Sequence, residues 1–124
     1  MKLRVRGNSL RLRLGRGEVR RLAEEGRVEE RTEFGPGTRP LVYEVLAIDV
    51  PAISATFEDG RITVGVPRTL ARQWAADDRV GIEGAQPTGG EPLRILIEKD
   101  FECLDAPPGE RQDDAFPNPR GTRC

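Results

Sequence analysis

Residues 2–14 read KLRVRGNSLRLRL, and this stretch decides the fold expected of the chain. Leu3 and Val5 alternate with basic residues before Gly7-Asn8-Ser9, and three leucines alternate with arginines after it. Alternation with a period of two, interrupted by glycine and asparagine, is typical of a β-hairpin with one buried face. The stretch therefore predicts two antiparallel strands whose apolar residues face a core and whose arginines face outward.

The following segments predict two short helices and further strands. Val19, Leu22 and Ala23 have the spacing of an amphipathic helix that Gly26 is placed to end. A second helix is expected to begin at Pro67. The other strands are expected around Val28, at Leu41–Val50, Ala55–Glu58 and Ile62–Val66, around Val80 and Ile82, and at Leu93–Glu98.

The two halves of the chain match at an offset of 52 residues without a gap. In the strands, for example, Leu12 falls on Val64. After the helices, Val28 falls on Val80. Each half reads β-β-α-β-β, and a unit of about 50 residues is too small to bury a core alone. We therefore expect a mainly β fold with two short helices, a pseudo-two-fold barrel built from repeats at residues 2–50 and 54–102.

This order of elements resembles the swapped-hairpin DNA-binding domains of the AbrB and MazE family. The motifs are GNSLRL at residues 7–12, GRITV at 60–64, VPRTL at 66–70 and DRVGI at 78–82. In that family two such units interleave their hairpins into one barrel, usually as a homodimer. The resemblance implies that this chain is a single-chain pseudo-dimer and a monomer.

The whole chain also resembles a family of small uncharacterised bacterial proteins. The likeness rests on the start MKLRVRGNSLRLRL, on LIEKDFECLD at residues 96–105 and on AFPNP at residues 115–119. It implies a one-domain cytosolic protein and brings no activity with it.

Composition excludes several classes of protein. Histidine is absent, which removes Ser-His-Asp and Cys-His nucleophiles and every histidine metal site. The two cysteines, Cys103 and Cys124, cannot build a cysteine-rich zinc site or a disulfide scaffold. No apolar run approaches the roughly 20 residues that span a bilayer. Alternating charges follow Met1 in place of an apolar stretch, so we expect no signal peptide. We expect a cytoplasmic protein without a cofactor and without membrane association.

Charge is unevenly distributed although the net charge is only −1. Residues 1–21 hold eight basic groups and one acid, whereas residues 100–124 hold six acids and three arginines. We expect a single β-barrel domain at residues 1–104 and an acidic, proline-rich tail at residues 105–124. Phe116 in this tail is a candidate for docking onto the barrel.

The arginines of the opening hairpin are the main candidate binding residues: Arg4, Arg6, Arg11 and Arg13. Arginine binds phosphate or carboxylate groups bidentately, so four arginines on one face predict an anion platform. The alternative is a solvated strand face whose long side chains cover apolar surface. The first hypothesis is a non-enzymatic, regulatory binding module that contacts nucleic acid or another polyanion, and the alternative is an adaptor for an acidic protein partner.

Two further clusters leave alternatives open. The repeat-related pairs Arg16/Arg68, Arg20/Arg72 and Arg27/Arg79 either form a two-fold basic patch or pair with neighbouring acids. Glu98, Asp100 and Glu102 share one side of an extended segment that also carries Cys103. Three carboxylates on one face either form a solvated strand edge or, in an enzyme or metal binder, supply an acid/base pair or hold a hard cation.

Overall fold

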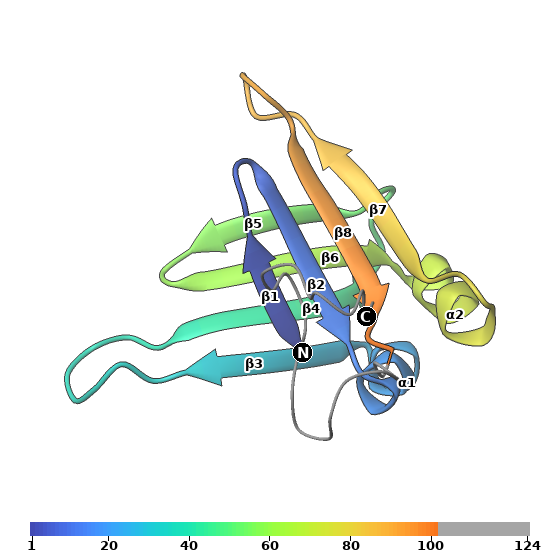
Figure 1. Ribbon diagram of the computed structural model, residues 1–124, viewed down its shortest axis with the longest axis horizontal. Coiled ribbons are helices and arrows are strands. Elements are labelled where there is room, and N and C mark those ends of the chain that lie inside the picture. Colours follow the sequence, from blue (N-terminus) through green and yellow to red (C-terminus); the bar gives the residue numbers. More distant parts are fainter. Residues whose placement is uncertain (102–124) are drawn as a thin grey trace, which may run out of the picture.

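The computed structural model of the 124-residue chain describes residues 1–101. The mainly β fold with two short helices is confirmed (Figure 1). The elements are β1 (Lys2–Val5), β2 (Ser9–Leu14), α1 (Arg16–Glu25), β3 (Arg27–Thr32), β4 (Leu41–Ile48), β5 (Ser54–Glu58), β6 (Arg61–Pro67), α2 (Arg68–Ala76), β7 (Gly81–Gln86) and β8 (Leu93–Lys99).

The strands form two four-stranded sheets with the same arrangement. Sheet A has the order β1-β2-β8-β7, and sheet B has the order β3-β4-β6-β5. In each sheet the two outer pairs are antiparallel and the central pair is parallel. Each sheet thus joins a hairpin from the first half of the chain to a hairpin from the second half. Figure 1 shows the two sheets crossing, with α1 and α2 together at one end.

The expected closed barrel is not formed, because the two sheets remain separate. Between β5 and β7, a side chain takes the place of strand pairing. The amide of Gln86 accepts a 2.7 Å hydrogen bond from the N–H of Ala55 and donates a 2.9 Å bond to its carbonyl. Since this amide satisfies both backbone groups, the edge of β5 needs no ladder partner there.

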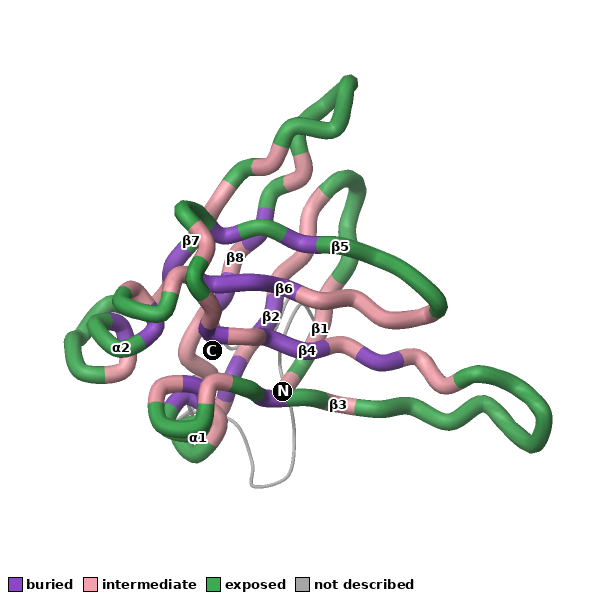
Figure 2. The backbone as a smooth tube through the Cα atoms, turned by 180° about the vertical axis from the view of Figure 1, so that it is seen from behind, coloured by how far each residue is buried: buried purple, intermediate pink, exposed green. Residues whose placement is uncertain are grey.

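The core lies between the sheets and under the helices, where Figure 2 shows the backbone as buried. Leu12 and Leu14 of β2 are fully buried, which confirms the inward face of the hairpin. The helices add Leu22 and Trp74 to this core. Val5 was expected on the same face, but it is 61% exposed because it lies at the tip of the hairpin, beyond the core.

The gapless match of the two halves is wrong by two residues at β7. Ile82 lies opposite Ile97 in sheet A as Val28 lies opposite Val45 in sheet B, whereas Val80 is 52% exposed. The extra residues form a connection after α2, and the indole Nε1 of Trp74 donates a 3.1 Å hydrogen bond to the carbonyl of Arg79 within it. This bond holds the connection against α2. Strand β7 therefore begins later in the sequence than the offset of 52 residues predicts.

Candidate anion-binding face

The four predicted arginines come from the β1–β2 hairpin, whose outward positions form part of the outer face of sheet A. Strand pairing sets Arg4 directly opposite Arg11 and Lys2 directly opposite Arg13. Arg6 follows β1, where its N–H donates a 3.2 Å hydrogen bond to the carbonyl of Ser9 across the turn. The hairpin therefore presents two rows of facing cations and a further cation at its tip.

The structure adds Arg94 to this face. Arg94 lies on β8 opposite Ser9 of β2, and its N–H donates a 3.0 Å hydrogen bond to the carbonyl of Asn8. It alternates with the buried Ile95, so the sequence marks it as outward-facing. Its place beside the hairpin depends on a parallel pairing between distant segments, which the sequence pattern does not reveal.

Glu98 near the end of β8 and Asp100 just after that strand contact the hairpin cations. Glu98 accepts hydrogen bonds from Nε of Arg11 at 2.7 Å and from Nε of Arg13 at 3.5 Å. Asp100 forms an ion pair of 2.8 Å with Nζ of Lys2. These carboxylates bind cations of the protein itself, which leaves them less suited to the acid/base or metal chemistry considered for them.

The other members of that cluster, Glu102 and Cys103, lie outside the described residues, as do Phe116 and Cys124. Within residues 1–101, no group of three or more acidic, histidine or cysteine side chains is arranged to hold a metal ion.

A hollow of about 650 Å³ opens between β2, β8 and β7. Arg11 and Arg94 line it from two strands, and Glu83 lines it from the third. Leu96, which lies opposite Arg11 across β2 and β8, adds apolar surface. Two guanidinium groups beside a shallow hollow can bind a phosphate or a carboxylate through paired N–H donors.

The outer face of sheet B differs from that of sheet A, because its arginines surround a buried glutamate. The side chain of Glu44 is only 7% exposed and lies 3.2 Å from Nη2 of Arg27 and 3.1 Å from Nη1 of Arg61. Thr63 donates a 2.8 Å hydrogen bond to the same carboxylate. Burial alone would raise the pKa of Glu29, but Arg27 and Arg61 hold it below its ordinary value. The cations of this face are therefore neutralised within the protein.

Three of the six repeat-related arginines pair with neighbouring acids, as the second of the two alternatives expects. Arg79 forms an ion pair with Asp77, and Arg68 pairs with Asp49. Arg27 pairs with Glu29 as well as with Glu44. Three others instead line a hollow between the helices, described below: Arg16, Arg20 and Arg72.

Comparison with protein families decides what the chain is related to. A model described as a family of unknown function, DUF7009, matches residues 1–120. The chain belongs to this family. The DUF7009 match spans both sheets and continues beyond β8, which confirms the whole-chain resemblance to an uncharacterised family. Comparisons with curated proteins and with solved structures found no match. In the part of the chain that the structure describes, no helix has the length and apolar character to cross a membrane.

Proposed function

We propose that this DUF7009 protein is a non-enzymatic binding module of regulatory type that holds nucleic acid on the outer face of sheet A. The observation that carries the proposal is the register of β1 and β2, which sets Arg4 opposite Arg11 and Lys2 opposite Arg13. Like charges directly opposite one another destabilise a strand pair. A polyanion lying across the hairpin adds to the partial relief that Asp100 gives at Lys2 and Glu98 gives at Arg11 and Arg13.

The neighbouring residues support the same face. Arg6 and Arg94 extend the row of cations at the tip of the hairpin, and among the described residues neither side chain has a carboxylate within ion-pair distance. The hollow beside Arg11 and Arg94 gives one phosphate a shaped contact. A cytoplasmic location suits such a module.

The architecture belongs to the proposal as well. We infer two β-β-α-β-β repeats with swapped hairpins, similar to AbrB and MazE units but fused in one chain. The pairs Leu12–Ile97 and Val64–Val45 support this, because one offset of 52 residues relates both. A symmetric two-fold grip on DNA does not follow, since the equivalent face of sheet B is neutralised around Glu44. We expect a monomer with one binding face.

Fluorescence anisotropy with labelled duplex DNA, measured against salt concentration, tests this function. If the four predicted arginines each neutralise one phosphate, log K against log salt has a slope of about −3.6, and binding weakens by about two orders of magnitude between roughly 50 and 200 mM salt. Replacing Arg11→Gln with Arg13→Gln should remove most of the binding. Arg31→Gln with Arg39→Gln is the control. It makes the same change in net charge at exposed residues of the β3–β4 hairpin of sheet B.

Circular dichroism of each variant separates a lost contact from a lost fold. If neither DNA nor RNA binds to the full chain at roughly 50 mM salt, where the phosphate contacts are strongest, the nucleic-acid function is wrong. The basic face then fits the adaptor alternative, with an acidic protein segment as its partner.

A further inference from the structure

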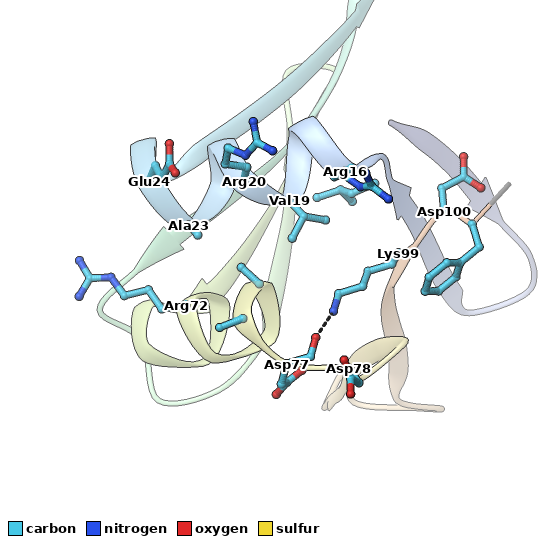
Figure 3. Close-up of a pocket in the computed structure, with 14 residues that line it drawn as sticks. Arg16, Val19, Arg20, Ala23, Glu24, Arg72, Asp77, Asp78, Lys99 and Asp100 are labelled. Atoms are coloured by element: carbon cyan, nitrogen blue, oxygen red, sulfur yellow. Dashed lines mark hydrogen bonds between the residues drawn. The ribbon is translucent and has the colours of Figure 1, made fainter.

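A second hollow, of about 1000 Å³, lies between α1, α2 and the end of β8 (Figure 3). We call it the helix groove. Its apolar surface comes from β2, from both helices and from the residue that follows β8 by two positions: Leu14, Val19, Ala23, Ala75, Ala76 and Phe101. Phe101 is 62% exposed at the point where the described chain ends. The helix groove thus has an apolar surface that includes Phe101, the last residue that the structure describes.

Charged residues of both signs line the helix groove, and the carboxylates are Glu24, Asp77, Asp78 and Asp100. Asp77 pairs with Arg79 and Asp100 pairs with Lys2. On one wall, Nζ of Lys99 donates a 2.7 Å hydrogen bond to the carbonyl of Asp77 and lies 5.5 Å from the centre of the Trp74 ring, as Figure 3 shows for the first contact. That cation is held within the protein. On the helices, Arg16, Arg20 and Arg72 have no ion pair with any described carboxylate.

We propose that the helix groove is the docking site of the chain's own segment at residues 110–119, with Phe116 against its apolar surface. The apolar surface of the groove suits an aromatic ring and the three helix arginines suit carboxylates, while Glu24 and Asp78 are the acidic residues that the segment must avoid. Asp113 and Asp114 closely precede Phe116 and supply carboxylates for the arginines of the helices. An aromatic side chain at the centre and polar groups at the rim are the usual anatomy of a protein interface.

The connection from the fold to this segment favours an intramolecular contact. The described chain ends at Phe101 on the wall of the groove, and the 15 residues that follow as far as Phe116 have a reach of roughly 50 Å. A short tether raises the effective concentration of the segment to the millimolar range, so weak contacts suffice. The DUF7009 match continues to residue 120, which makes this segment part of the family unit.

Paramagnetic relaxation in the full chain tests the docking. A nitroxide is attached to Asn118→Cys after Cys103 and Cys124 are replaced by serine, and the backbone amides are observed by NMR. Amides of Val19, Ala23 and Ala75 should lose intensity beside the label. Phe116→Ala should restore that intensity, whereas Leu104→Ala, which removes another apolar residue between Phe101 and Phe116, should not.

Reversal of the helix charges gives a second variant on the groove side. Arg20→Glu with Arg72→Glu should also restore the intensity, while Arg21→Glu with Arg31→Glu makes the same change in net charge away from the groove.

Three results would overturn the proposal. No loss of intensity on the helices means that the segment does not dock there. Losses at Arg4 and Arg11 mean that the acidic tail covers sheet A instead. Losses on the helices in a mixture of labelled and isotope-enriched chains mean that a second copy supplies the segment. The measurement involves no nucleic acid, so its outcome is independent of the function proposed for sheet A.

Discussion

Nε of Arg11 donates a 2.7 Å hydrogen bond to Oε1 of Glu98, which lies 87 residues later in the sequence. The bond crosses the parallel pair of β2 and β8, and Arg13 lies directly opposite Glu98 in that pair. One carboxylate therefore restrains two of the cations that we assign to the binding face.

Removing the charge of Glu98 is expected to strengthen nucleic-acid binding. Glu98→Gln keeps the shape of the side chain and removes the negative charge that holds Arg11 and Arg13. The repulsion that it removes is worth about 1 kcal/mol, or roughly fivefold in affinity. Anisotropy titrations at low salt measure the change. Glu58→Gln, an exposed position on sheet B, makes the same change in net charge and should have little effect. An equal gain in the two variants would show that net charge acts, and not the face of sheet A.

Two adjacent residues of β2, Arg11 and Leu12, differ in burial, so we expect their substitutions to differ in their effect on stability. Leu12 is fully buried, so Leu12→Ala should lower the free energy of unfolding by about 2–5 kcal/mol. Arg11→Ala removes a partly exposed ion pair, and this should cost about 1 kcal/mol or less. Urea unfolding of the two variants measures both values. Similar losses at the two positions would contradict the facing of β2.

The sequence predicts the β1–β2 hairpin well, because its alternation and its glycine turn are local signals. It does not predict that Arg94 and Glu98 lie beside that hairpin, since their position depends on pairing across most of the chain. The error at Val80 has a specific cause. Val80 and Ile82 are two residues apart and share one face of a strand, so a shift of two residues leaves the alternation unchanged.

Side-chain contacts between the two sheets are a second kind of feature that the sequence does not predict. The bonds from Gln86 to the backbone of Ala55 replace a strand ladder, and this distinguishes two separate sheets from the expected barrel. Nothing in the local sequence around Gln86 indicates its partner. The same holds for Glu44, which stands in an apolar run and is buried among cations from two other strands.

Loss of the Glu44 charge is expected to destabilise sheet B. Glu44→Gln leaves Arg27 and Arg61 facing one another without the buried carboxylate between them. The expected decrease in the free energy of unfolding is about 1–3 kcal/mol, because the hydrogen bonds involve a charged and buried group. Glu33→Gln is the control, since Glu33 forms an exposed ion pair with Arg31 worth about 1 kcal/mol or less. Chemical denaturation near neutral pH should rank the two variants in that order, and the reverse order would contradict a structural role for Glu44.

The amino group of Met1 connects sheet A to sheet B and to α1. It lies 2.6 Å from Oε2 of Glu18 and 3.2 Å from Oε1 of Glu30. Glu18 also accepts a 2.8 Å hydrogen bond from the N–H of Gly15 at the start of α1. Burial alone would lower the pKa of the amine, but the hydrogen bonds to the two glutamates outweigh it and raise the pKa above its ordinary value.

This contact predicts a loss of stability as the pH rises. Because the pKa of the amine is higher in the folded protein, its contribution is complete below about pH 8, the pKa of an unfolded amine, and disappears as the pH passes the folded value. Glu30→Gln removes one partner but leaves Glu18 bound to the helix start. We expect it to cost about 0.5–1 kcal/mol at neutral pH, after solvent screening. The difference from the unaltered chain should shrink between about pH 8 and pH 10, the window below the ordinary pKa of Tyr43, whose own pKa burial and Glu30 raise. Urea unfolding of both proteins across this range measures the difference, and a constant difference would exclude the Met1 amine as its source.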